Sequence, residues 1–413
     1  MTTFLTIVYI VVVNPAILSA DGQTGISFSG AMTATVLVCF TMTLMMGVYA
    51  RLPFAVAPGL GLNAFFAYSV IIGQQVPWQV ALGIVFWAGL LFLVVSATPL
   101  RKMIAMAIPR NLRYAAGVGI GVFLTFIGLK NAGFVVSDPV TYVKFGELGW
   151  PSVVTLLGVA LAAFLLKRKS SLAFLAAMAF VTVAAIIFGW TRPPTAIVSL
   201  PDFHSVFFKL DIIGALKLSL LPVMISIMFT DLFDSISTLM GVSHAAELVD
   251  ENGEPKNLKE GLVVDSFATF GAGLFGSSPG TAYIESVAGI EVGGRTGWTS
   301  VVCAVCFLPC LFLGPLAAAV PPYATAVVLL LVGAYMFRCV GEMEFGSIED
   351  TVPAFVTIIL IPLTFSITQG ILWGFISHAA LYLITGRGRE VSPVFYIIAA
   401  VSVGLVWLEH WPH

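Results

Sequence analysis

Apolar blocks of roughly 17 to 25 residues recur along the whole chain, and a helix of that length crosses the hydrocarbon core of a bilayer. Inside such a core every backbone polar group must be bonded within the protein. Irregular backbone survives there only where it is buried in protein or lines a cavity. The composition agrees, because 59% of the 413 residues are hydrophobic and only 10% are charged, against about 25% charged in soluble domains. The sequence therefore predicts an all-α polytopic membrane protein.

Fifteen apolar segments can be delimited, at residues 3–18, 28–50, 59–73, 77–98, 111–131, 151–167, 170–190, 214–241, 259–277, 280–291, 296–319, 321–340, 352–367, 369–386 and 391–410. The segments 59–73 and 280–291 are too short to cross as helices, and both follow Pro/Gly-rich strings, RLPFAVAPGLGL and GSSPGTAY. We expect each to be a half-helix preceded by extended chain. Hydropathy leaves open whether 391–410 crosses the membrane, lies on its surface or packs against the other segments.

Lys and Arg gather after even-numbered segments, at 101–113, 167–169, 256–259 and 387–389. Because cytoplasmic loops carry the excess of positive charge, we expect these loops and the N-terminus to be cytoplasmic, in an inner or plasma membrane. The net charge of -2 and the lack of a basic patch argue against a nucleic-acid partner. The five cysteines lie in apolar surroundings and are expected to pack, as is His378, so no metal ion and no cofactor is expected.

The two halves of the chain resemble each other. APGLGLNAFF (57–66) matches SPGTAYIESV (278–287), and LRYAAGVGIGVFLTFIGLKNAG (112–133) echoes PPYATAVVLLLVGAYMFRCVGEM (321–343). The offset is about seven segments, an odd number, so the second copy would be inverted in the membrane. Inverted repeats with paired broken helices indicate a secondary transporter whose site lies where the half-helices meet.

The stretch FTDLFDSIST (229–238) places two carboxylates in an apolar segment, where one charge costs on the order of 3 kcal/mol. Asp231 and Asp234 are three residues apart and share a helix face. The half-helix ends offer unpaired N–H groups and a partial positive charge. The candidate substrate-binding residues at that depth are polar, namely Asn63, Thr281, Glu285 and Ser286 with Asp231 and Asp234.

Acidic and aromatic side chains define the chemistry of this site. Burial and a neighbouring acid disfavour the charged form of a carboxylate, so Asp234, Glu285 and Asp231 are candidate proton carriers. Carboxylate oxygens also match paired N–H donors on a heterocycle. Phe65 and Phe229 are candidates for stacking on a base.

Each assignment has a structural alternative. Asn63 could cap a helix or bond another segment, Glu285 could be an ion-pair partner, and the aromatic residues could simply pack. One aspartate of the pair could bind ligand while the other bonds a neighbouring helix. Asp265, near the start of the ninth segment, is expected to be structural.

The chain is similar to the AzgA-like purine (hypoxanthine/adenine/guanine) permeases of the nucleobase/ascorbate transporter superfamily. The strings that carry the resemblance follow the family's order along nearly the whole chain: TTFLTIVYIVVVNPAILS, LPFAVAPGLGLNAFFAY, FIGLKNAG, FTDLFDSISTLMGV, SSPGTAYIESVAGIEVGGRTG and PAFVTIILIPLTFSITQGI. The resemblance implies fourteen transmembrane segments in two inverted repeats of seven, with short paired strands before half-helices 3 and 10. A core domain would comprise residues 1–110 and 201–319, and a gate domain residues 111–200 and 320–413.

The resemblance also implies residue roles. It places the substrate-binding residues of segments 3 and 10 at Asn63 and Glu285, and the acid of segment 8 at Asp234, with Asp231 a close second. The chain departs from the family at Ser237, where Gly is common, and at Gly280, where a β-branched residue is common. The polar N-terminal helix of the family is short or missing. These departures put the fine purine selectivity in doubt.

The resulting hypothesis is a proton-coupled importer of hypoxanthine, guanine and adenine, with a possible homodimer. One alternative keeps the fold and changes the cargo or the ion, to uracil, xanthine, an inorganic anion or sodium coupling. A remote alternative is an intramembrane aspartyl protease. Such enzymes place their two aspartates on separate helices, whereas Asp231 and Asp234 share one.

Overall fold

The computed structural model describes residues 1–194, 196–249 and 255–410. Within this part of the chain, eight helices are long and apolar enough to cross a membrane, and four further apolar helices are shorter. The predicted class, a helical multi-pass membrane protein, is confirmed. The short segment 59–73 appears as one of the shorter helices, Leu60–Gly73.

The first half of the chain contains, in order, α1 (Thr2–Ile7), α2 (Ile10–Ser19), η1 (Ala20–Gly22), α3 (Phe28–Val48), β1 (Val56–Pro58), α4 (Leu60–Ala64) with its π-helical continuation η2 (Phe65–Gly73), α5 (Trp78–Ala97), α6 (Leu100–Ala107), α7 (Arg110–Asn131), β2 (Val135–Asp138), β3 (Tyr142–Phe145), α8 (Trp150–Lys167) and α9 (Ala173–Ile187). The second half contains η3 (Gly214–Leu216), η4 (Leu218–Leu220), α10 (Leu221–Ala245), α11 (Leu258–Phe275), β4 (Gly280–Ala282), α12 (Ser286–Glu291), α13 (Gly297–Phe307), η5 (Leu308–Phe312), α14 (Gly314–Ala318), α15 (Pro322–Phe337), η6 (Arg338–Glu342), α16 (Ile348–Thr364), α17 (Ile367–Ile384), η7 (Gly388–Glu390) and α18 (Pro393–His410).

Two short strands pair with each other inside the helical body of the protein. β1 and β4 pair antiparallel, with Ala57 opposite Thr281 and Pro58 opposite Gly280. Both strands are fully buried, and each leads into a short helix, α4 or α12. Since each strand bonds the other, this non-helical backbone has partners at membrane depth. The predicted extended segments before two half-helices are therefore confirmed.

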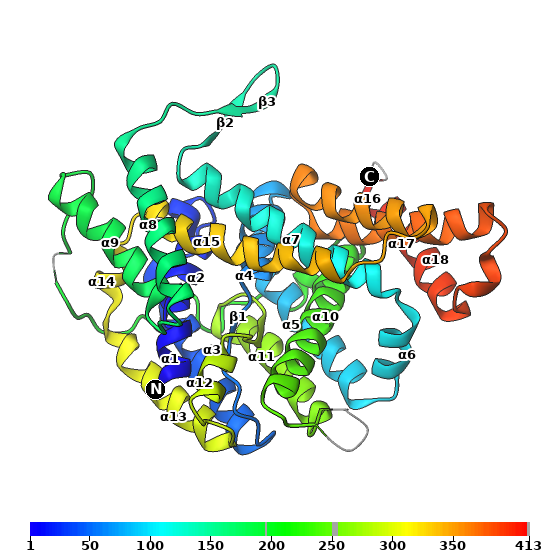
Figure 1. Ribbon diagram of the computed structural model, residues 1–413, viewed down its shortest axis with the longest axis horizontal. Helices are drawn as coiled ribbons and strands as arrows, with labels where there is room; N and C mark the ends of the chain where they lie inside the picture. Colours follow the sequence, from blue (N-terminus) through cyan, green and yellow to red (C-terminus); the bar gives the residue numbers. More distant parts are fainter. Residues whose placement is uncertain (195, 250–254, 411–413) are drawn as a thin grey trace.

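Helices from the two halves pack against each other around these strands. α3 packs along α13, and α5 packs along α11. The second contact is close because a Cβ at Gly89 would collide with the backbone nitrogen of Phe270. Figure 1 shows α7 and α15 running side by side across the molecule, and α7 also contacts α16 and α17.

The sequence did not predict a β-hairpin between α7 and α8. β2 and β3 pair antiparallel and project from the helical body (Figure 1). The turn is closed by Asp138, whose Oδ1 accepts backbone N–H bonds from Val140 at 2.9 Å and Thr141 at 3.0 Å. These two bonds, together with Lys144, lower the pKa of Asp138 to about 2. A polar loop can thus form strands through Asp–backbone turn chemistry that hydropathy does not register.

The last apolar segment forms α18, which packs on α17 and α10. It also contacts α6 and η4. Pro393–Glu409 is one of the shorter apolar helices. These contacts show that residues 391–410 pack against the other segments.

Candidate functional site

α10 carries the two aspartates of FTDLFDSIST into different surroundings. Asp231 is completely buried, and its Oδ2 accepts a hydrogen bond from Thr269 Oγ1 of α11. Asp234, one turn later, is only half-buried, and the Thr281 side chain of β4 lies close to its carboxyl group. One aspartate therefore bonds a neighbouring helix, and the other faces the end of β4.

Glu285 lies between β4 and α12 and is half-buried. Its Oε1 accepts a hydrogen bond from the Tyr9 hydroxyl at 2.8 Å. Tyr9 itself is 1% exposed, and its ring contacts Phe174 with 4.9 Å between centroids. Glu285 is thus held by a neutral donor from the first segment, and the structure shows no ion-pair partner for it within the described residues.

Thr281 and Ser286 flank Glu285 and differ in what they can offer a ligand. The Thr281 hydroxyl lies 3.4 Å from that of Ser235 on α10. The Ser286 hydroxyl accepts the backbone N–H of Ala55 at 3.0 Å, which ties the start of α12 to the chain before β1. Ser286 therefore has a structural contact, whereas Thr281 joins β4 to α10 beside Asp234.

Asn63 is completely buried and is turned toward α2. Its Nδ2 donates to Asn14 Oδ1 at 2.8 Å, while its Oδ1 has no hydrogen-bond partner in the described part of the chain. Asn14 also bonds Thr35 of α3 and two serines just before β4, Ser277 and Ser278. Asn63 therefore bonds another segment, which was the structural alternative given for it, although the sequence did not predict the rest of this buried network.

The two aromatic candidates occupy different positions. Phe65 is completely buried. Phe229 on α10 stacks on Phe233, with centroids 5.9 Å apart and rings inclined by 13°, and meets Phe375 of α17 edge-on at 6.1 Å. Phe229 therefore lies on the side of α10 that faces α17, and Phe65 lies in the protein interior.

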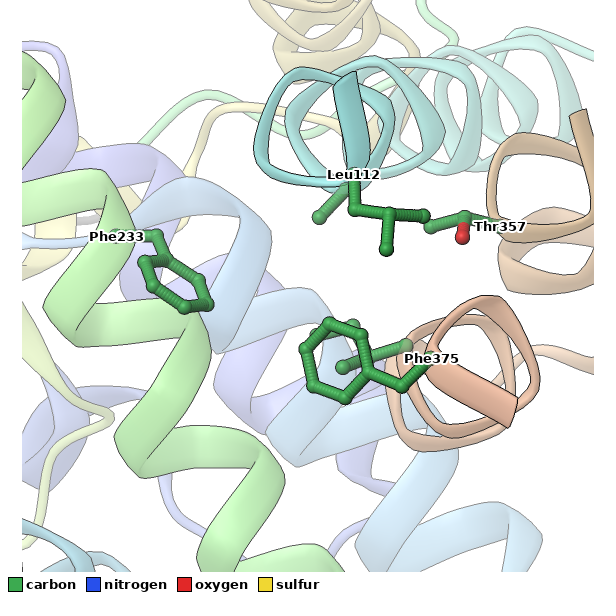
Figure 2. A pocket seen from close by; sticks show the side chains of 6 residues that line it. Leu112, Phe233, Thr357 and Phe375 are labelled. Carbon is green, nitrogen blue, oxygen red and sulfur yellow. The ribbon is translucent and has the colours of Figure 1, made fainter. Parts of the chain in front are cut away.

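A small apolar gap separates α10 from α7, α16 and α17 (Figure 2). Figure 2 shows Phe233 and Phe375 facing each other across it, with Leu112 and Thr357 on the remaining side. The gap is too narrow to admit a water molecule. A planar ligand could enter this gap only if the helices around it moved apart.

Sequence reasoning missed Tyr9, Asn14 and Thr269 as contacts of the site. Asp265, expected to be structural, accepts the backbone N–H of Ala282 at 3.2 Å and so holds β4 in place. The sequence did carry a signal for Asn14, since an amide inside IVYIVVVNPAIL needs a partner at that depth. Nothing in one sequence names the partner, because the contacts join residues up to 264 positions apart.

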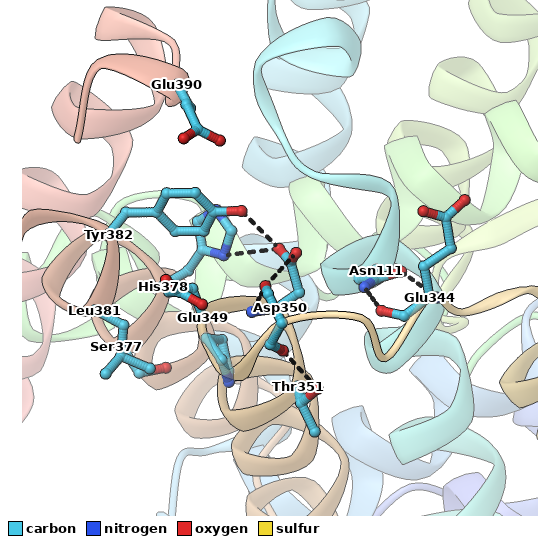
Figure 3. A network of polar contacts seen from close by, with 12 residues as sticks. Asn111, Glu344, Glu349, Asp350, Thr351, Ser377, His378, Leu381, Tyr382 and Glu390 are labelled. Atoms are coloured by element: carbon cyan, nitrogen blue, oxygen red, sulfur yellow. Dashed lines mark hydrogen bonds and ion pairs between the residues drawn. The ribbon is translucent and has the colours of Figure 1, made fainter. Parts of the chain in front are cut away.

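A second polar cluster joins the start of α16 to the end of α17 (Figure 3). Asp350 accepts hydrogen bonds from the Tyr382 hydroxyl at 3.1 Å and the Ser347 hydroxyl at 2.8 Å. His378 Nδ1 lies 4.0 Å from the same carboxylate. Nearby, Arg387 binds Glu390 through two N–H groups at 2.9 and 2.7 Å. His378 thus joins two helices, in the structural role expected of it.

Comparison with known proteins shows that the chain is similar in sequence to permeases. Residues 1–373 match the model of the permease family Xan_ur_permease. The chain is 40% identical over 403 residues to the adenine permease AdeP of Escherichia coli K12, covering 97% of this chain and 90% of AdeP. It is 38% identical over 408 residues to the guanine/hypoxanthine permease PbuO of Bacillus subtilis 168, covering 97% of this chain and 94% of PbuO.

The fold is similar to that of the transmembrane domain of the cyanobacterial bicarbonate transporter BicA. The TM-score is 0.64 over 90% of this chain and 96% of that domain, at 19% sequence identity. This likeness concerns the fold alone. The family match over residues 1–373 rules against the aspartyl protease alternative. The chain therefore belongs to the Xan_ur_permease family and is a multi-pass membrane transporter.

Proposed function

We propose that this permease imports purine nucleobases, namely hypoxanthine, guanine and adenine, by proton symport across the cell membrane. The observation that carries the proposal is the placement of Asp234 and Glu285. Both are half-buried acids that lie around β4, where two short strands lead into two half-helices. The relatives AdeP and PbuO, described as adenine and guanine/hypoxanthine permeases, support the substrate class.

The chemistry of the acids fits this cargo. The N1–H and 2-amino groups of guanine would pair with the two oxygens of one carboxylate, and a second carboxylate would accept an imidazole N–H. Adenine presents another donor pattern, so it would need a protonated acid or the Asn63 amide. Asp234, Glu285 and Asn63 are the proposed ligand residues. Asp231 is a weaker candidate because it is already bonded to Thr269.

We further propose fourteen transmembrane segments in two inverted sevens, with a cytoplasmic N-terminus. The contacts support this internal symmetry. An offset of seven apolar segments makes α11 the counterpart of α3, and α13 the counterpart of α5. The contact of α3 with α13 is therefore the counterpart of the contact of α11 with α5. In the same way the contact of α7 with α16 has its counterpart in that of α8 with α15, and β1 pairs with β4 about the pseudo-axis. Such repeats are the usual framework of secondary transporters.

Transport would follow from movement of the core domain (1–110 and 201–319) against the gate domain (111–200 and 320–413). The closed gap between Phe233 and Phe375 supports this division, because it lies between α10 of the core and α17 of the gate. Protonation of an acid can bias such a movement only if the proton binds the two states with different affinity. A homodimer through the gate domain is part of the same proposal and rests on the family resemblance.

The test is uptake of labelled hypoxanthine, adenine, guanine and uracil into cells that lack purine uptake, at two external pH values, with and without sodium. We expect the rate of purine uptake to be higher at acidic external pH and to be the same with and without sodium. Asp234→Asn and Glu285→Gln should reach the membrane and lose uptake. Wild-type uptake by either variant would refute the site, and uracil uptake or sodium dependence would favour the alternatives.

A further inference from the structure

Asn14 is the centre of a completely buried hydrogen-bond network that joins α2, α3, α4 and the chain before β4. The amide Nδ2 of Asn14 lies 2.8 Å from Thr35 Oγ1 and 3.2 Å from Ser277 Oγ. Its Oδ1 lies 2.8 Å from Asn63 Nδ2 and 3.1 Å from Ser278 Oγ. All four hydrogen-bonding positions of this side chain are thereby used.

Thr35 determines which atoms of this network donate hydrogen bonds and which accept them. Its hydroxyl lies 2.6 Å from the Ala31 carbonyl one turn earlier in α3, and a carbonyl can only accept. The single hydroxyl proton of Thr35 is therefore committed to Ala31, and its oxygen must accept from Asn14. This places the Asn14 nitrogen toward Thr35 and the Asn14 oxygen toward Asn63.

The orientation of Asn63 follows from that of Asn14. Since Asn14 presents an oxygen, Asn63 must present its nitrogen, and its own carbonyl oxygen is directed elsewhere. That oxygen is buried and has no partner within the described residues. An unpartnered buried acceptor costs free energy, and each such group in a native structure calls for an explanation.

We propose that Asn14 is a positioning residue that fixes the Asn63 amide with its carbonyl oxygen free, so that this oxygen accepts an N–H of the nucleobase. The proposal rests on the proposed function and deepens it, because it states which atom of Asn63 selects the ligand. A site of this kind accepts a base that presents a donor there and rejects one that presents a lone pair, which would leave two acceptors facing each other.

The experiment uses Thr35→Val, which removes the directing hydroxyl at nearly constant shape, and Thr35→Ser as the matched control that keeps it. Hypoxanthine affinity is measured on the purified full chain in each background. Thr35→Val frees the Asn14 and Asn63 amides to rotate, and affinity should fall by roughly tenfold, the effect of one hydrogen bond. Thr35→Ser should remain within about twofold of wild type.

A second background separates orientation from packing. In Asn63→Asp both side-chain atoms are acceptor oxygens, so one oxygen faces the base in either orientation while the other faces Asn14 Oδ1. This variant should bind hypoxanthine more weakly than wild type. Adding Thr35→Val to it should cause no further loss, because Asn14 is then free to turn its Nδ2 toward the carboxylate at position 63. An equal loss in both backgrounds would show that Thr35 acts through packing, and no loss in either would show that Asn63 is oriented by other means.

Loss of all binding in Asn63→Asp that Thr35→Val does not restore would show that the base needs the nitrogen of Asn63, and it would also overturn the proposal. Failure of the proposed function is distinguishable, because the wild-type protein itself would then bind no purine.

Discussion

The Tyr9–Glu285 contact allows one prediction to be worked through from the geometry. Tyr9→Phe removes the hydroxyl that donates to Glu285 Oε1 at 2.8 Å and keeps the ring that packs against Phe174. The substitution therefore isolates one hydrogen bond. Glu285 is half-buried and can be hydrated after the loss, so we expect the fold to be retained and the carboxylate to become free to rotate.

The magnitude follows from the kind of bond. A hydrogen bond to a charged group contributes about 1.5–3 kcal/mol, and the partial exposure of Glu285 places this one near the lower limit. About 1.4 kcal/mol corresponds to a tenfold change in an equilibrium constant. If Glu285 binds the base, substrate binding in the variant must also fix the orientation of the Glu285 carboxylate, which lowers the binding free energy. KM for hypoxanthine should therefore rise by up to roughly tenfold.

The assay is initial-rate uptake of labelled hypoxanthine, normalised to the amount of protein in the membrane. Tyr396→Phe is the matched control, because its hydroxyl donates to the Gly388 carbonyl at 2.9 Å outside the candidate site. We expect wild-type KM for the control. A wild-type KM for Tyr9→Phe at normal expression would refute the reasoning that Tyr9 orients a substrate-binding carboxylate.

Two further predictions concern stability. Hydrogen bonds from Ser205, from Ser29 at 2.8 Å and from the backbone outweigh partial burial and lower the pKa of Asp202 from 3.8 to about 2. This stabilisation is present above pH 3.8 and is lost as the pH falls toward 2, so the Tm difference between wild type and Asp202→Asn in detergent should be full at pH 7 and vanish near pH 2. A constant difference would contradict the assignment. Gly89→Val should prevent accumulation of folded protein, because its side chain would collide with α11, whereas Gly117→Ala, which meets nothing within 4 Å, should purify normally.

The sequence was informative wherever the bilayer itself sets the constraint. A run such as 28–50 must be helical because lipid offers no hydrogen bonds, and it appears as α3, Phe28–Val48. The Pro/Gly strings before 59–73 and 280–291 broke that pattern, and both positions hold strands. The hairpin β2–β3 was missed because turn chemistry outside the bilayer leaves no hydropathy signal.

The candidate site was predictable only as a set of residue types. Two acids three positions apart in an apolar helix had to face something polar, and Asp231 and Asp234 do so. Which acid is bonded to a helix and which is half-exposed depends on Thr269 and Thr281, which come from other parts of the chain. The partners of Glu285 and Asn63 were equally hidden, because Tyr9 and Asn14 precede them by 276 and 49 positions.

The sequence by itself determined that this chain is a helical membrane protein whose helical pattern is broken at two places, because hydropathy and backbone hydrogen bonding act locally along the chain. Only the tertiary structure decided which polar groups find partners. Pairing β1 with β4 brings the first and second halves of the chain together. Whether a buried polar atom forms a hydrogen bond then depends on which residue of the other segments lies opposite it. Among the residues that the structure describes, the carbonyl oxygen of Asn63 is left without a partner for that reason, since Asn14 meets its nitrogen.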